Sequence, residues 1–157
     1  MFGGGQERGL RPGTLPVPLI AGFGLAASLA LKEHADRACV CRAARADALA
    51  ALEPLGIVFN GDPERMSHHT LNFSVPGVDS EAAIVALKDI AAFSNGSACT
   101  SQSYEPSHVL TAACLPKDQV AGALRLSWSH LTESVDWAAI AERLAALSTG
   151  LHQNGHS

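Results

Sequence analysis

The sequence predicts an α/β fold in which helices pack on a small, mostly antiparallel sheet. Alanine is abundant while aromatic residues make up only 5% of the chain, which favours closely packed helices. Apolar residues alternate with period two at 70–75 and 123–128, as in half-buried strands, and stretches with helical apolar spacing separate and follow them. A chain of 157 residues is long enough to bury a sizeable core.

The first fifty residues predict an irregular glycine-rich segment and two helices. Five glycines in 1–14, without apolar periodicity, predict irregular backbone. Dense apolar residues predict a helix from Pro16 to Lys32 that is buried nearly all round, and an Ala- and Arg-rich stretch predicts a second helix over 35–52. The prolines and glycines of 15–31, and the lack of a basic leader, argue against a membrane span or signal peptide.

Short strands and helices alternate through the rest of the chain. Asp79 or Ser80 is expected to cap the first helix that follows the strand at 70–75. A polar loop is expected at 94–106, and the tail from Ser148 is expected to fray. We expect strands at 57–59, 70–75, 90–93 and 123–128, and helices at 79–88, 107–113, 117–122 and 135–147.

Charge and cysteine spacing exclude several classes of protein. The net charge of −4 and the absence of a long basic run argue against nucleic-acid binding by this chain alone. Four irregularly spaced cysteines, none in a Cys-x-x-Cys pair, argue against a disulfide framework or a structural zinc site and favour the reducing cytoplasm. Cys114 is expected to be buried, and the adjacent His68 and His69 to be solvated loop residues.

Cys99 is the candidate nucleophile. It lies in Ser94-Asn-Gly-Ser-Ala-Cys99-Thr-Ser-Gln-Ser-Tyr-Glu-Pro106, where a buried structural cysteine would have little apolar company. A loop of small residues lets a thiol move between two positions, and nearby positive charge makes a thiolate more reactive. The loop composition alone favours an idle exposed cysteine, because exposed thiols without function are common, so other motifs must decide.

Three separated motifs resemble the NifS-like cysteine desulfurases, pyridoxal-phosphate enzymes of the class V aminotransferase family. The motifs are Gly3-Gly-Gly-Gln-Glu-Arg-Gly-Leu-Arg-Pro-Gly-Thr14, Ala86-Leu-Lys-Asp-Ile90 leading into the Cys99 loop, and Glu105-Pro-Ser-His-Val-Leu110 followed by Leu124-Arg125-Leu-Ser127. The similarity extends to about Leu147, and the long loop is similar to that of the subclass with an extended catalytic loop. It implies fold type I aminotransferase architecture, with 1–32 a remnant of the large cofactor domain, 33–148 the C-terminal small domain and 149–157 a flexible tail.

The resemblance implies sulfur transfer from L-cysteine to Cys99, which becomes a persulfide while L-alanine is released and pyridoxal 5'-phosphate serves as electron sink. Arg125 is similar to the family's arginine for the substrate carboxylate, although a plain surface-strand arginine is the alternative. Thr14 is similar to the threonine that reaches the cofactor phosphate in the neighbouring subunit, and it could also simply cap the helix near Pro16.

The implied partners are a homodimeric copy or a missing N-terminal half, and a sulfur-acceptor or scaffold protein. The delivered sulfur would serve iron–sulfur cluster assembly, tRNA thiolation or DNA sulfur modification. Apart from a transient iron–sulfur contact at Cys99, no metal is expected. No direct contact with a membrane or a nucleic acid is expected either.

The sequence departs from the family pattern at the cofactor. The family's Schiff-base lysine, on a Ser-x-His-Lys segment, has no counterpart, because Lys32, Lys88 and Lys117 all fall in or beside helices that match the small domain. Ser129-His130 stand where the family continues with Gly-Arg. We therefore expect a truncated, split or artificial fragment with negligible activity alone. The alternatives are a sulfur carrier or interaction module that uses Cys99 without cofactor, and a fragment that folds poorly.

Overall fold

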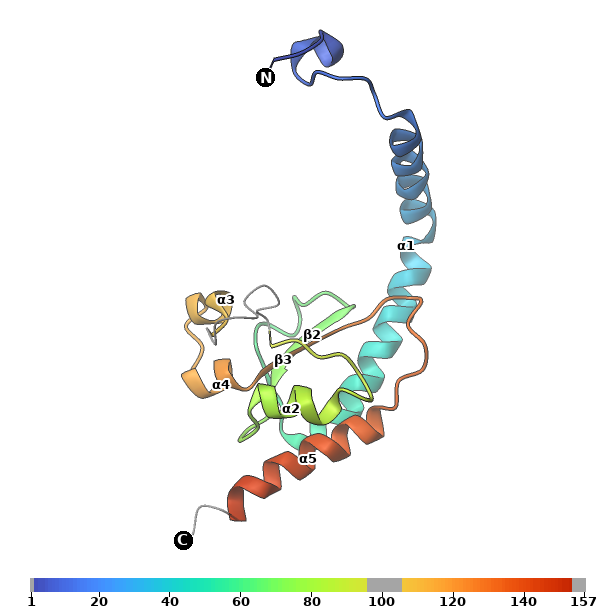
Figure 1. The fold of residues 1–157 in the computed structure, drawn as a ribbon. Helices are drawn as coiled ribbons and strands as arrows, with labels where there is room; N and C mark the ends of the chain where they lie inside the picture. Colours follow the sequence, from blue (N-terminus) through green and yellow to red (C-terminus); the bar gives the residue numbers. More distant parts are fainter. Residues whose placement is uncertain (1, 96–105, 154–157) are drawn as a thin grey trace. The chain divides into compact units, whose positions relative to one another are not determined.

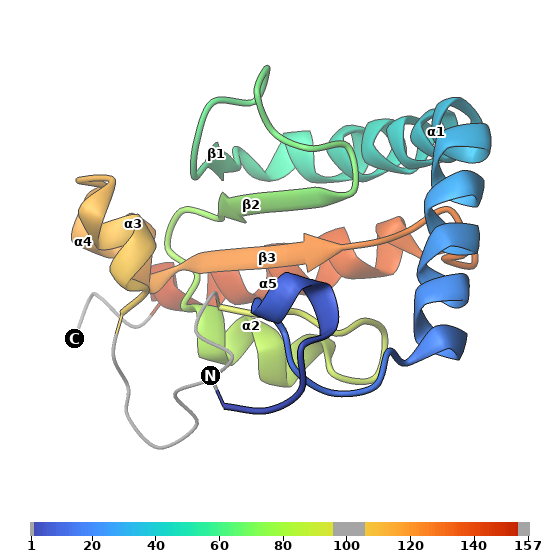
Figure 2. The ribbon, with the colours of Figure 1, turned by 90° about the horizontal axis from the view of Figure 1, so that it is seen from above.

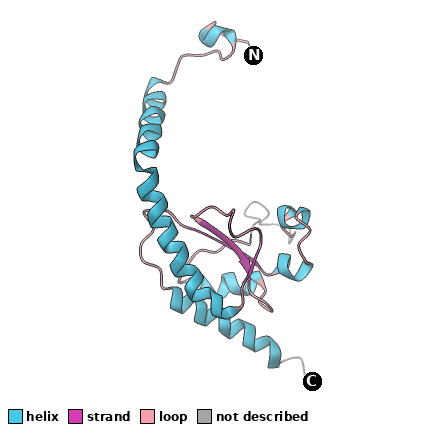
Figure 3. Cartoon of the chain, turned by 180° about the vertical axis from the view of Figure 1, so that it is seen from behind, coloured by secondary structure: helices cyan, strands magenta, loops and turns pink. Residues whose placement is uncertain are grey.

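The computed structural model describes residues 2–95 and 106–153. Contacts divide the chain into two compact units, Met1–Arg37 and Ala38–Ser157. In chain order the elements are the 3₁₀ helix η1 (Gln6–Gly9), α1 (Val17–Leu52), the 3₁₀ helix η2 (Glu53–Leu55), β1 (Val58–Phe59), β2 (Thr70–Ser74), α2 (Ser80–Leu87), α3 (His108–Ala112), α4 (Lys117–Ala121), β3 (Ala123–Ser127) and α5 (Trp137–Gln153) (Figures 1 and 3).

The second unit contains a three-stranded antiparallel sheet in the order β1-β2-β3. Figure 2 shows the three strands side by side, with α5 passing behind them. The pairing sets Phe59 opposite Phe73 and Asn72 opposite Arg125. These strands confirm the ones predicted at 57–59, 70–75 and 123–128, and the architecture confirms the predicted α/β class.

One face of this sheet forms the core. Leu71, Phe73 and Leu124 are fully buried, as expected for alternate residues of strands that turn one face to helices. They pack with apolar side chains of α1, α2 and α5, namely Leu52, Ala83, Leu87, Ile140 and Leu144. The opposite face carries the polar alternates, such as Asn72 and Arg125. Trp128 and Trp137 pack edge to face with ring centroids 6.1 Å apart.

A bidentate ion pair joins α5 to the turn after α2. Arg143 Nη1 and Nη2 lie 2.5 Å and 2.9 Å from the two carboxylate oxygens of Asp89, and Nη1 also donates to the carbonyl of Ala86 at 2.6 Å. The hydrogen bond from Arg143 and a backbone hydrogen bond lower the pKa of Asp89. Because both side chains are exposed, the pair adds little to overall stability, but it fixes the turn that leads toward Ser94.

Two predicted helices are one continuous helix, α1. The expected break near 33–34 is wrong, because no glycine or proline interrupts the chain between Leu25 and Leu52. An ion pair between Arg37 and Glu33, at 2.6 Å with spacing i, i+4, spans that position.

The expected burial of the helix at 16–32 is also wrong for this chain by itself. Leu19, Phe23 and Leu31 are 73%, 77% and 84% exposed. Despite this apolar surface, none of the helices in the described ranges is both long and apolar enough to cross a membrane.

The strand predicted at 90–93 is absent. After α2 the chain turns at 88–90, and only Ser94 pairs with the sheet, through a single bridge to Arg125. The helix predicted at 135–147 begins slightly later and continues to Gln153 as α5. The cap of α2 confirms the prediction, since Asp79 accepts from the amides of Glu81 and Ala82.

Candidate functional site

Four polar residues, which we name the polar row, cross the polar face of the sheet: Asn60, Asn72, Arg125 and Ser94. Asn72 and Arg125 are direct partners of β2 and β3. The amide of Asn60 donates to the Asn72 carbonyl at 3.0 Å, and Arg125 and Ser94 exchange backbone hydrogen bonds of 2.6 Å and 3.1 Å. Because residues directly opposite each other in antiparallel pairing share a face, the four side chains form one line across the sheet.

Arg125 contributes a guanidinium group to the middle of the polar row. It is half-buried on β3, which lies between β2 and the bridge to Ser94, so it is not on an open sheet edge. Within the described parts of the chain, no carboxylate or other acceptor bonds its guanidinium. A planar guanidinium matches a carboxylate through two parallel hydrogen bonds. The position therefore suits recognition of a carboxylate brought by a ligand.

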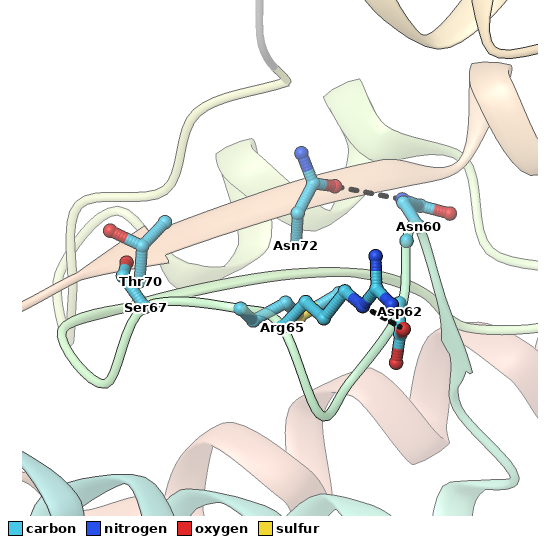
Figure 4. Close-up of a pocket in the computed structure, with 8 residues that line it drawn as sticks. Asn60, Asp62, Arg65, Ser67, Thr70 and Asn72 are labelled. Atoms are coloured by element: carbon cyan, nitrogen blue, oxygen red, sulfur yellow. Dashed lines mark hydrogen bonds and ion pairs between the residues drawn. The ribbon is translucent and has the colours of Figure 1, made fainter.

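A chain of side-chain amides adjoins Arg125. Asn60 Nδ2 donates to Asn72 Oδ1 at 2.8 Å (Figure 4), and Gln119 Nε2 donates to Asn60 Oδ1 at 2.8 Å. Ser74 Oγ donates to the carbonyl of Gln119 at 2.7 Å. These bonds attach α4 to the sheet. None of these four residues was expected from the sequence, although Asn72 and Ser74 occupy the polar alternates of a predicted strand.

Both described ends of the loop at 94–106 are held by the same unit. Its start, Ser94, is bridged to Arg125. Beyond its end, Ser107 is buried and caps α3 by accepting from the amide of Leu110 at 3.5 Å. Leu110 packs with Val120 and Ala123 in a small second core. Cys99, the predicted nucleophile, lies outside the described residues, between these two fixed points of the sequence.

Thr14, the predicted cofactor contact, belongs to the first unit. The side chain of Arg11 donates from Nη1 to the carbonyls of Gly13 and Thr14 at 2.9 Å and 3.2 Å, which folds the glycine-rich segment back on itself. Thr14 is exposed. It does not cap α1, because the carbonyl of Pro16 accepts the first helical bonds.

An open cavity of about 290 Å³ lies beside the polar row in the second unit (Figure 4). Arg45 on α1 donates to the carbonyls of Thr70 and Pro63 at 3.2 Å and 3.4 Å, which ties the segment that lines the cavity to the helix. An ion pair of 3.3 Å joins Arg65 to Asp62 at its edge. The cavity is lined by Asn60, Gly61, Asp62, Arg65, Met66, Ser67, Thr70 and Asn72.

The residues described do not by themselves fit pyridoxal phosphate. Lys32, Lys88 and Lys117 are all exposed, and none of them lines the cavity. The one carboxylate at the cavity, that of Asp62, already pairs with Arg65. A Schiff-base enzyme needs a lysine inside the pocket that holds the cofactor. The described residues therefore offer no Schiff-base lysine for the cofactor.

The other cysteines are free thiols with separate surroundings. Cys41 is buried and its carbonyl accepts from Trp128 Nε1 at 3.2 Å. Cys39 is exposed on α1. The prediction that Cys114 is buried is wrong, because it follows α3 in a left-handed conformation, with φ of 58°, that turns it to solvent. Across the described ranges, no three His, Cys, Asp or Glu side chains gather as metal ligands.

Curated proteins and solved structures that are similar to this chain include a cysteine desulfurase, DndA and a NifS-like protein. No family model matches the chain. A cysteine desulfurase of Mus musculus is 40% identical over 141 residues, which is 87% of this chain and 30% of that protein. The crystal structure of DndA from Streptomyces lividans is 43% identical with a TM-score of 0.62 and covers 82% of this chain and 36% of its own.

A third match extends the comparison to nearly the whole chain. A NifS-like protein of known structure is 26% identical with a TM-score of 0.68, and the match covers 98% of this chain and 38% of that one. The chain thus spans about a third of the length of the proteins that it matches.

Proposed function

We infer that this chain belongs to the cysteine desulfurase family as a C-terminal portion, and from that premise we propose that Cys99 is the sulfur acceptor of such an enzyme. The observation that carries the proposal is the half-buried residue Arg125. Its guanidinium has no acidic partner among the described residues, and its backbone pairs with Ser94 at the start of the Cys99 loop. A side chain suited to binding a carboxylate thus lies beside the start of the loop. A sulfur carrier without a small-molecule substrate would need no such group.

In the proposed reaction Arg125 holds the carboxylate of L-cysteine through paired hydrogen bonds. The Cys99 thiolate attacks the sulfur of the substrate, so that a sulfur–sulfur bond forms on Cys99 and the bond between the substrate's Cβ and sulfur breaks. The electron pair of the broken bond stays with the three-carbon product, which takes up a proton and leaves as L-alanine. Pyridoxal phosphate, when bound, supplies the electron sink that makes this cleavage accessible.

We propose that the cofactor is held mainly by a region of the enzyme that this chain does not supply. Residues 1–32 would belong to that larger cofactor domain, 33–148 would form the small domain, and Thr14 would contact the cofactor phosphate of a neighbouring subunit. The exposed apolar side chains of residues 17–31 support this division, because an apolar surface of that kind favours burial against another protein surface. A sulfur-acceptor protein would then take the sulfur from Cys99 in a reducing compartment such as the cytoplasm.

The chain alone is expected to hold no pyridoxal phosphate. After incubation with the cofactor and desalting, its absorbance spectrum should lack the band of a protein-bound Schiff base, since Lys32, Lys88 and Lys117 are all exposed. Likewise, L-cysteine plus cofactor should release no alanine above the background of a Cys99→Ala variant. A band that survives desalting, and that disappears on replacing one of these lysines, would show that the chain has its own cofactor site.

Acceptance of sulfur by Cys99 can be tested without the cofactor. Cysteine persulfide donates its outer sulfur to a thiolate by simple exchange, so the chain is treated with this donor and its cysteine peptides are examined by mass spectrometry. We expect one added sulfur on the peptide that contains Cys99 and much less on those of Cys39 and Cys114, which are exposed thiols outside the polar row. Equal labelling of all exposed cysteines would refute the assignment.

A further inference from the structure

We propose that Asn72 is a second substrate-binding residue, which donates a hydrogen bond to the same carboxylate as Arg125. The inference rests on the proposed function and adds a residue that the resemblance does not assign. Asn72 is half-buried on β2, and its Cα is the direct partner of that of Arg125 across the strands. Side chains at such positions share a face with Cβ atoms about 5 Å apart, so one carboxylate can reach both.

The hydrogen-bond network fixes which way the Asn72 amide faces. The carbonyl of Phe59 can only accept, so the Gln119 atom that lies 3.2 Å from it must be the donor nitrogen. The same Gln119 nitrogen also donates to Asn60, so the Asn60 atom that accepts this bond must be Oδ1. The other amide atom of Asn60, Nδ2, is therefore the one that donates to Asn72. Asn72 must therefore offer Oδ1 to Asn60, with its own Nδ2 on the far side of the amide. Figure 4 shows that nitrogen turned away from Asn60.

The free donor of Asn72 points to a ligand more than to a packing role. In the described part of the chain its Oδ1 is bonded while its Nδ2 has no acceptor. Asn72 and Arg125 are both only partly buried, so their free donors can be hydrated, and an acceptor that bonds to both side chains can take the place of that water. A carboxylate has enough lone pairs to accept from both side chains at once.

The test compares two persulfide donors, cysteine persulfide and cysteamine persulfide, which lacks the carboxylate. In both cases the Cys99 thiolate attacks the outer sulfur, the donor's sulfur–sulfur bond breaks and the remaining thiolate leaves, so no oxidant or reductant is consumed. The measured quantity is the ratio of the two transfer rates on one protein sample. Because both rates come from the same sample, partial unfolding of a variant cancels in the ratio.

We expect Asn72→Ala to lower the preference for cysteine persulfide about fivefold, the loss typical of one partly exposed hydrogen bond to a charged acceptor. Asn72→Asp should lower it further, because a carboxylate there pairs with Arg125 and repels that of the donor. Ser127→Ala, a matched change at an exposed position on the same face of β3, should leave the ratio unchanged.

The outcomes separate this inference from the proposed function. If neither donor labels Cys99 of the unaltered chain, the proposed function fails and the role of Asn72 falls with it. If Cys99 is labelled and Arg125→Ala lowers the ratio but the Asn72 variants do not, the proposed function stands and the inference is overturned. A ratio that falls in Ser127→Ala as much as in Asn72→Ala would also overturn it, because any change to this face would then have the same effect.

Discussion

Cys99→Ser is expected to abolish sulfur acceptance by the chain. A serine hydroxyl is a far weaker nucleophile than a thiolate near neutral pH and cannot form a persulfide, so the transfer rate should fall by about 1,000-fold or more, as for removal of other enzymatic nucleophiles. The measurement is the sulfur content of the intact chain after treatment with cysteine persulfide. Any remaining label should be spread over the other cysteines, without preference for donors that carry a carboxylate.

Two matched substitutions serve as controls for this prediction. Cys39→Ser and Cys114→Ser each remove an exposed thiol outside the polar row, and both variants should accept sulfur on Cys99 as the unaltered chain does. The melting temperature should stay the same in these two control variants, since surface substitutions usually change stability by no more than about 0.5 kcal/mol. If Cys114→Ser lost the label while Cys99→Ser kept it, Cys114 would be the acceptor.

The strands were predictable because their information is local. The period-two alternation of 70–75 and 123–128 depends only on which residues face the helices, and the structure places Leu71, Phe73 and Leu124 on that side. The segment at 90–93 failed because its apolar residues pack partly into the core without pairing, and only Ser94 meets the sheet. Burial and pairing are separate events, and sequence periodicity reports burial alone.

The site was predictable only in part, because it depends on register. Arg125 was found through a motif, but its relation to Asn72 follows from antiparallel pairing between residues more than fifty positions apart. Gln119 contributes through a hydrogen bond to a carbonyl on β1, which no local pattern reveals. The long apolar stretch of α1 shows the opposite limit, since its apolar composition predicted burial but its side chains are exposed in this chain.

Phe73→Ala is expected to cause the largest loss of stability that a single core substitution produces here. Phe73 is fully buried on β2, opposite Phe59 on one strand and Leu124 on the other. Removing its ring deletes apolar contacts and leaves a cavity that the sheet can only partly close, at a cost of about 3–5 kcal/mol. The free energy of unfolding, measured by urea denaturation and followed by circular dichroism, should fall by that amount.

The same chemical change at Phe23 provides the control, because its side chain is 77% exposed on α1. Phe23→Ala should shift the free energy of unfolding by no more than about 0.5 kcal/mol. Phe73 also lies next to Asn72 in the chain. A cavity on the core face of β2 should therefore make the position of Asn72 relative to Arg125, on the opposite face, less well defined. The preference for cysteine persulfide should then fall even at urea concentrations where the variant remains folded. Equal losses of stability in the two variants would mean that the ring of Phe73 does not organise this core.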